Sequence, residues 1–139
     1  MDTLIIDGGP LTPDQVVAVA HRRLRAVPAP DLDRRMTPAR EVVDRAVDSG
    51  QVVYGITTGF GALAGTNIGR SETETLQVNL VRSHASGVGT PLPDEMVRAM
   101  LLLRARTLAQ GHSGVRPEVV AKLLEMLDRD ILPVVPSQG

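Results

Sequence analysis

The sequence predicts a mainly helical fold with one or two short strands. Apolar residues recur at helical spacing in five stretches, and each stretch begins with a capping or proline signal. Only residues 4–6 and 52–53 form short apolar runs typical of strands. Five helices therefore account for most of the expected structure.

The first thirty residues are predicted to form an edge strand and one long helix. The strand is Leu4–Ile6, which the turn residues 7–10 close. Thr12 caps the helix and Pro13 occupies its first position. The helix is expected to end at the prolines of residues 28 and 30. Its apolar face comprises Val16, Val17, Ala20, Leu24 and Val27.

A second cap-and-proline signal at Thr37 and Pro38 predicts the start of the next helix. Its body begins at Glu41, and Gly50 is a natural terminator. The buried stripe comprises Val42, Val43, Ala46 and Val47. We therefore expect a short helix that ends directly before the extended pair at 52–53.

A long loop and a third helix are predicted next. The loop runs from residue 54 through the glycines at 65 and 69, and long loops inside compact domains are often binding loops. Residues 71–74 form a capping box, with Ser first and Glu three residues later. The helix that follows places Leu76, Leu80 and His84 one above another. Glycines at 87 and 89 are expected to close it.

The last third of the chain is predicted to contain two more helices. Residues 94–110 form a helix that is apolar almost all round, which is typical of a helix inside a larger assembly. Arg98, Arg104 and Arg106 interrupt it, and a buried Arg would need a partner. Pro117 opens the last helix, and residues 131–139 are expected to be extended with nothing in the chain to pair with them.

Composition limits the classes of function. Fifteen basic and sixteen acidic residues give a net charge of −1, without the basic stripe expected of a nucleic-acid or membrane-surface partner. No apolar run approaches the roughly 20 residues of a transmembrane helix. The absence of cysteine excludes a disulfide framework. A cytoplasmic protein without nucleic-acid or membrane partners is expected.

The most informative stretch is residues 54–61, Tyr-Gly-Ile-Thr-Thr-Gly-Phe-Gly. It contains the only Tyr and the only Phe of the chain, together with three glycines and two threonines. Ordinary cores rely on aromatic side chains for buried area. Here both aromatic residues occur in a loop whose glycines allow a close backbone approach to a ligand. This pattern indicates chemistry rather than packing.

Three blocks in order resemble the histidine and aromatic amino-acid ammonia-lyases, which use a methylidene-imidazolone (MIO) cofactor. The first block is residues 54–61, the second is Asn-Leu-Val-Arg-Ser-His-Ala at 79–85, and the third is Gly-His-Ser-Gly-Val-Arg-Pro at 111–117. The resemblance covers residues 53–139 and is most similar to histidine ammonia-lyases, whereas residues 1–35 match loosely.

The resemblance implies that residues 1–139 are the N-terminal part of a larger lyase domain in the fumarase/aspartase-like superfamily. The Ala-Ser-Gly that cyclises into MIO would lie beyond Gly139, so the segment alone is expected to be an inactive fragment. The intact enzyme would be a helical homotetramer that converts L-histidine into urocanate and ammonia.

The resemblance also implies roles for individual residues. Tyr54 would be the catalytic base that takes the β-proton of the substrate. His84 would contact the substrate side chain by hydrogen bonding, and Gly61 and Asn79 are further substrate-binding candidates. Supporting roles in the loop are assigned to Gly55, Thr58, Gly59 and Phe60. No metal site is expected, because no two histidines have the spacing of a helical metal site.

A second Ala-Ser-Gly occurs at residues 85–87. Cyclisation needs a tightly held loop in which a backbone amide attacks the carbonyl two residues earlier. Residues at the end of a helix are poorly placed for that attack, and Gly directly after a helix is its commonest terminator. We therefore interpret residues 85–87 as a helix end and not as a cofactor precursor.

Four alternatives stay open at this stage. The substrate of the lyase could be tyrosine or phenylalanine, or the enzyme could be an MIO aminomutase that returns ammonia to the β-carbon. Residues 59–64 match a dinucleotide fingerprint weakly, but glycines at 65 and 69 would break the helix that it requires. The apolar helix at 94–110 would also suit a non-catalytic helical interaction module.

Overall fold

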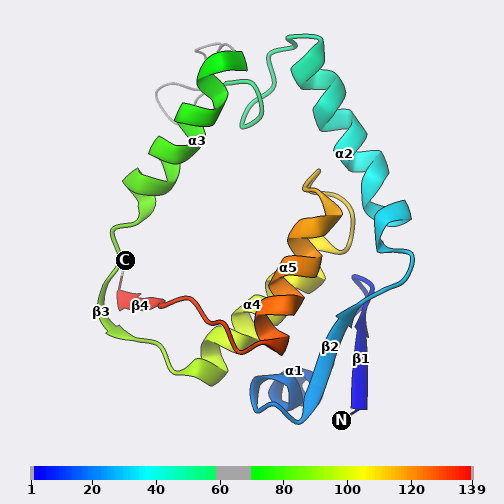
Figure 1. Ribbon diagram of the computed structural model, residues 1–139, viewed down its shortest axis with the longest axis vertical. Coiled ribbons are helices and arrows are strands. Elements are labelled where there is room, and N and C mark those ends of the chain that lie inside the picture. The colour runs from blue at the N-terminus through cyan, green and yellow to red at the C-terminus, as the bar shows by residue number, and fades with distance from the viewer. Residues whose placement is uncertain (1, 59–69, 139) are drawn as a thin grey trace.

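The computed structural model describes residues 2–58 and 70–138, with residues 70–74 described by their backbone alone. Figure 1 shows a packed lower part, from which two long helices rise and converge at the opposite end. We call residues 2–36 and 93–131 the body, and residues 37–58 and 70–92 the arch. No helix in the described ranges has the length and apolar character needed to span a bilayer.

The body begins with a β-α-β unit. Strand β1 (Asp2–Ile6) and strand β2 (Leu24–Pro28) pair in parallel, with Asp2 opposite Leu24 and Ile6 opposite Pro28. Helix α1 (Pro13–Ala20) connects them, and its predicted N-terminal cap is confirmed: Thr12 and Gln15 exchange side-chain-to-backbone hydrogen bonds. The strand predicted at residues 4–6 is confirmed as part of β1.

The predicted continuation of the first helix to residue 27 is wrong. The chain leaves the helix after Ala20, and Arg22 adopts a left-handed φ of 59°. Leu24 and Val27 then lie in β2, where Val27 pairs with Ile5 of β1. The helical spacing of these residues is a coincidence. The strand was not predicted because its parallel partner lies about twenty residues earlier in the sequence and leaves no local signal.

The predicted start of the second helix is also wrong. Helix α2 spans Leu32–Asp48, so Pro38 lies inside it rather than at its first position. Leu32 and Met36 in the first turns are 4% and 1% exposed, and their burial in the core extends the helix five residues before Thr37. The Thr37 hydroxyl donates to the Asp33 carbonyl instead of capping a new helix (2.7 Å).

The later helices follow the prediction more closely. Helix α3 spans Arg70–His84, α4 spans Asp94–Leu108 and α5 spans Pro117–Asp128. Two further short strands, besides β2, were not predicted. These are β3 (Val88–Pro91) and β4 (Pro136–Gln138), which pair antiparallel, so the extended tail does have a partner within the chain. The fold is mainly helical, as expected, with four short strands in the described residues.

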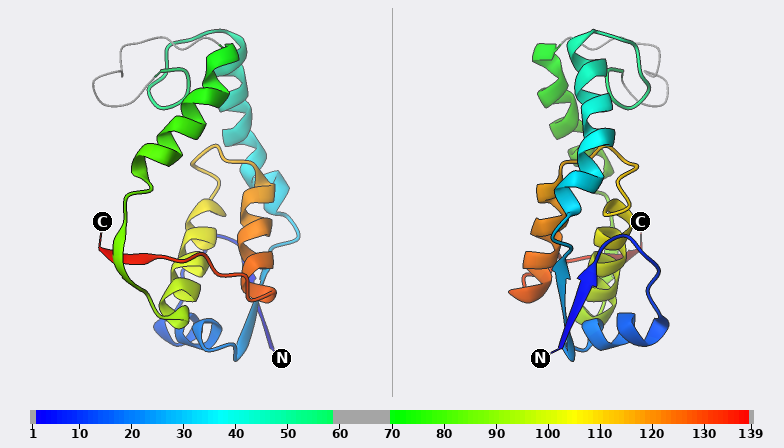
Figure 2. Two further views of the ribbon diagram at one scale, coloured as in Figure 1. Left: turned by 60° about the vertical axis from the view of Figure 1, so that its left-hand side comes forward. Right: turned by 90° about the vertical axis from the view of Figure 1, so that its right-hand side faces the viewer.

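The hydrophobic core lies wholly in the body. The α4–α5 pair is its centre, α1 packs on α4, and β2 packs on α5, as Figures 1 and 2 show from three directions. The cluster comprises Ile6, Val19, Ala26, Leu32, Met36, Leu102, Ala105, Ala109, Val120, Leu124 and Leu127. One side of α4 is therefore buried, while Met96 and Met100 on another side are 50% and 48% exposed.

The buried Arg98 has the partners that its position requires. Its guanidinium donates to the carbonyls of Val19, Ala20 and Leu127 and to the Asp130 carboxylate, at 2.8–3.3 Å. These carbonyls lie in the last turns of α1 and α5, where helices leave acceptors unsatisfied. The side chain of Arg98 thus links α4 to the C-terminal ends of α1 and α5.

Candidate functional site

The candidate site begins with a turn that carries Tyr54. The Val53 carbonyl accepts hydrogen bonds from the amides of Ile56 (3.1 Å) and Thr57 (3.0 Å). Gly55 lies inside this turn with φ of 75°, a left-handed conformation that glycine adopts without steric cost. The loop-support role predicted for Gly55 remains a proposal, but its conformation gives it a physical reason.

Side-chain bonds close the same turn from the other direction. The Thr57 hydroxyl accepts a hydrogen bond from the Val53 amide (2.8 Å) and donates one to the Gln51 carbonyl. Thr57 and Thr58 are 9% and 2% exposed, so both threonines face inward. The motif predicted a supporting role for Thr58 but none for Thr57. The only local signal for Thr57 was that a threonine hydroxyl can form hydrogen bonds with nearby backbone groups.

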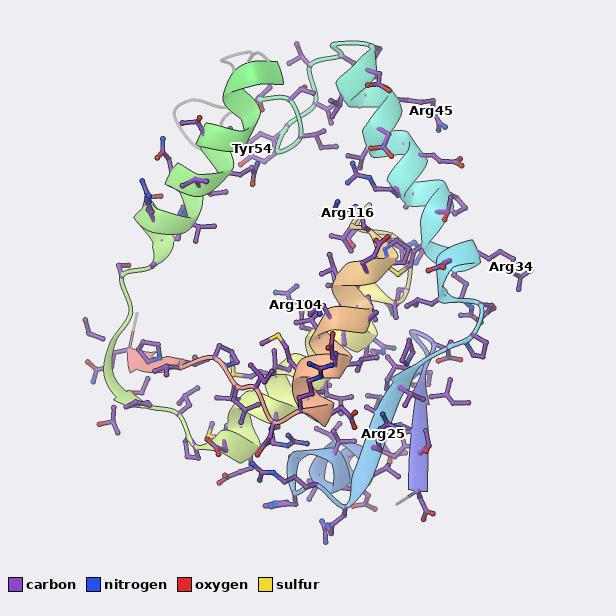
Figure 3. All side chains as sticks on the ribbon, in the orientation of Figure 1. Arg25, Arg34, Arg45, Tyr54, Arg104 and Arg116 are labelled. Carbon is purple, nitrogen blue, oxygen red and sulfur yellow. The ribbon has the colours of Figure 1, made fainter. Side chains whose placement is uncertain are left out.

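Tyr54 faces the opposite way. Two thirds of its surface is accessible (66%), and it is the most exposed residue of the segment 53–58. Figure 3 shows Tyr54 at the arch end of the molecule, remote from Arg25 on β2. The turn therefore buries its two threonines and presents its phenol.

Helix α3 carries the other described candidates. The predicted alignment of Leu76, Leu80 and His84 is confirmed by the helix, but only the two leucines are half-buried and His84 is exposed. His84 Nδ1 lies 2.9 Å from the Leu80 carbonyl and 3.1 Å from the Ser83 hydroxyl, so its own helix provides its partners. Asn79 is also exposed.

Three of the predicted site residues, Gly59, Phe60 and Gly61, lie outside the described residues, as does the weak dinucleotide fingerprint at 59–64. Of the remaining candidates, Tyr54 and Thr58 lie in one turn, and Asn79 and His84 lie in helix α3. Both segments belong to the arch (Figure 1). Among residues 2–58 and 70–138, no three His, Asp or Glu side chains gather as metal ligands would.

Two groups of ion pairs in the body lie away from these residues. Arg25 and Asp128 form a two-bond ion pair (2.6 and 2.8 Å), which holds the pKa of the Asp128 carboxyl below its usual value. Hydrogen bonding from Arg22 lowers the pKa of Asp130, with smaller contributions from Arg98. These ion pairs join strand β2 and the end of α1 to the end of α5, and they support the fold rather than the site.

The Ala-Ser-Gly at 85–87 follows α3 directly and is exposed throughout. The Ala85 amide donates to the Val81 carbonyl (3.0 Å), which continues the helical hydrogen-bonding pattern. A cofactor made by cyclisation needs these residues in a tight, enclosed loop. The surroundings of 85–87 do not fit such a group.

The profile of the aromatic amino acid lyase family matches residues 11–139. The chain belongs to that family. The match includes the Tyr54 turn, helix α3 and the body from α1 onward, so the candidate site lies within the shared region.

Individual relatives agree with this assignment. The chain is 48% identical to a histidine ammonia-lyase of Caldanaerobacter subterraneus subsp. tengcongensis, over all of this chain and 27% of that protein. A solved histidine ammonia-lyase from Trypanosoma cruzi matches the fold with a TM-score of 0.88 at 41% identity, over 100% of this chain and 26% of that one.

A tyrosine aminomutase from Streptomyces globisporus also matches, with a TM-score of 0.92 and 34% identity over 99% of this chain and 26% of that one. The chain thus spans about a quarter of the length of the relatives that it matches. Members with different reactions share this part of the fold, so fold similarity alone does not select the reaction.

Proposed function

We propose that this chain forms part of an ammonia-lyase that eliminates ammonia from L-histidine without oxidation and yields urocanate. The family membership and the 48% identity to a histidine ammonia-lyase support the reaction class. The observation on which the site assignment rests is the Tyr54 turn: a closed backbone ring with two buried threonines presents one exposed phenol.

Tyr54 is assigned the role of general base. Elimination requires removal of a proton from the β-carbon of the substrate, while the amino group departs from the α-carbon with the electron pair of its C–N bond. A base must reach its proton within hydrogen-bonding distance, and a fixed turn with an outward phenol meets this geometric requirement better than a mobile surface side chain. Gly55, Thr58, Gly59 and Phe60 are assigned to support of the loop.

The imidazole of the substrate is assigned to α3. His84 is exposed at the last turn of the helix and offers a ring nitrogen as donor or acceptor. Asn79, five residues earlier, offers a side-chain amide, and Gly61 offers a backbone amide. A site that forms hydrogen bonds with a polar side chain rejects analogues that lack the matching group.

The same proposal includes the cofactor and the assembly. The MIO group supplies an electrophile that assists departure of the amino group, and residues outside these 139 would form it, because the tripeptide at 85–87 does not fit the role. We also propose a homotetramer in the cytoplasm. The exposed apolar side chains of α3 and α4, such as Val81 (68%) and Met96 (50%), support burial against further protein.

An aminomutase is the second candidate. The chain is 34% identical to a tyrosine aminomutase over 99% of its length, so this reaction is kept beside the lyase. The two reactions share the elimination step and differ in whether ammonia adds back at the β-carbon, so a tyrosine or phenylalanine substrate belongs to the same test.

The test replaces the matching segment of the Caldanaerobacter relative with this 139-residue chain. Purified chimera is supplied separately with L-histidine, L-tyrosine and L-phenylalanine, and products are separated by chromatography. We expect urocanate and equimolar ammonia from histidine. Formation of a β-amino acid from tyrosine would support the aminomutase instead. A folded, tetrameric chimera that converts none of the three would contradict the proposed function.

A further inference from the structure

The residues just before Tyr54 are held from both sides by Thr57. Its hydroxyl binds the Val53 amide and the Gln51 carbonyl, while its amide binds the Val53 carbonyl. Both backbone groups of Val53 are therefore used within the turn. The backbone that leads into Tyr54 belongs to a closed ring of hydrogen bonds, and Thr57 supplies the only side chain among those bonds.

The direction of the Tyr54 side chain depends on this backbone. The Tyr54 side chain itself is 66% exposed. The path of the main chain through Val53 and the left-handed Gly55 (φ 75°) then sets the direction of its Cα–Cβ bond. A change of backbone path at Val53 would move the phenol, although the side chain itself is unaltered.

We propose that Thr57 is a positioning residue for the elimination reaction and sets the position of the Tyr54 phenol through the Gln51–Val53 backbone. This inference rests on the proposed role of Tyr54 as the base. Neither the family resemblance nor the sequence pattern assigned a role to Thr57, which lies between Gly55 and Thr58 in the motif.

The chemistry of threonine fits the role. A hydroxyl has one proton to donate and lone pairs to accept, and Thr57 uses both capacities at once. Its branched β-carbon also limits χ1 rotation, which keeps the hydroxyl between its two partners. Thr57→Val keeps the shape and removes both bonds, whereas Thr57→Ser keeps the hydroxyl and removes one methyl group.

The first experiment uses the fact that the chain has one Tyr and no Trp. Tyrosine fluorescence anisotropy of the 139-residue chain therefore reports on Tyr54 alone. We expect lower anisotropy in Thr57→Val and a parental value in Thr57→Ser. Thr107→Val is the matched control, since the Thr107 hydroxyl also donates to a backbone carbonyl, Leu103 (2.9 Å), but in α4. Parental anisotropy in Thr57→Val would overturn the proposal.

The second experiment measures kinetics of the same variants in the chimera. Misplacement of a base by about 1 Å can cost about 100-fold in rate, so we expect kcat of Thr57→Val to fall by about that factor. KM is expected to stay near the parental value, because the base acts in the transition state and not in substrate binding. Thr57→Ser should restore kcat. A fall in activity that only follows a fall in folded fraction would overturn the positioning role.

The Tyr54→Phe variant distinguishes failure of the proposed base from failure of the positioning role of Thr57. If Tyr54→Phe loses turnover and Thr57→Val keeps it, the proposed base stands and the positioning role of Thr57 is overturned. If Tyr54→Phe keeps turnover, the proposed base is itself overturned, and the positioning role falls with it.

Discussion

The body and the arch differ in how much each stabilises itself. All eleven residues of the core cluster belong to the body, where α1, α4, α5 and β2 pack on one another. In the described part of the arch, the buried residues are Ala46, Thr57 and Thr58, and α3 packs on no other helix or strand to a comparable extent. Yet every described candidate for catalysis or substrate binding lies in the arch.

This difference separates the part that has a hydrophobic core from the part that carries the proposed site residues. An isolated helix of about 15 residues is marginal in water, and α3 has 15 residues with Val78 and Val81 46% and 68% exposed. Regions with few buried contacts open most easily. We infer that the body is a stable platform and that the arch acquires its final stability from protein surfaces that cover its apolar side chains.

The largest expected contrast is between core leucine and arch valine. Leu102 is 0% exposed in α4, and Leu102→Ala should lower the free energy of unfolding by about 2–5 kcal/mol. Val81→Ala in α3 should change it by less than about 0.5 kcal/mol. Urea unfolding of the 139-residue chain measures both. Equal losses at the two positions would show that α3 is part of the same core.

Arg98 provides a second contrast within one helix. Arg98→Met leaves the Ala20 carbonyl without its donor, whereas the Val19 and Leu127 carbonyls keep the amides of Arg22 and Asp130. A buried unsatisfied acceptor costs about 1–3 kcal/mol. Arg104→Met is the control, because Arg104 is exposed and the structure gives it no ion pair among the described residues. The same urea measurement should find Arg104→Met close to the parent. A harmless Arg98→Met would mean that water replaces the guanidinium.

The ion pairs of the body should give a smaller, acid-dependent effect. The Arg25 hydrogen bonds lower the pKa of Asp128 in the folded state, so this pair stabilises the fold above the ordinary carboxyl pKa of about 3.9. That stability is lost as the pH falls through the lowered folded pKa.

The unfolding free energy should therefore fall less between pH 7 and pH 3 in Asp128→Asn than in the parent. If Asp128→Asn and the parent lose the same amount on acidification, the exposed Arg25–Asp128 pair contributes nothing measurable, as many surface pairs do.

Local signals in the sequence were sufficient where local chemistry decides the structure. Thr12 and Pro13 predicted the start of α1, and Pro117 predicted the start of α5, because caps and proline act within one turn. The need of Arg98 for a partner was also predictable, since a buried charge cannot remain unpaired.

Tertiary effects decided the remaining features, and no local pattern contained them. Strand β2 forms because β1 lies beside it, and α2 starts early because Leu32 and Met36 reach the core. At the candidate site, the motif pointed to Tyr54 but not to Thr57, because the proposed role of Thr57 depends on which backbone groups the turn brings to its hydroxyl. The exposure of His84 was likewise unpredicted, because α3 packs on no other described helix or strand as extensively as the helices of the body do.

The most direct test of the central claim is the kcat of Tyr54→Phe in the chimera with L-histidine as substrate. The substitution removes one hydroxyl, and loss of a general base typically costs about 10²–10⁴-fold in rate. Gln51→Ala is the matched control, since only the backbone carbonyl of Gln51 takes part in the turn. We predict a kcat lowered within that range, with parental folding and a parental rate for Gln51→Ala. A Tyr54→Phe variant that turns over at the parental rate would contradict the account.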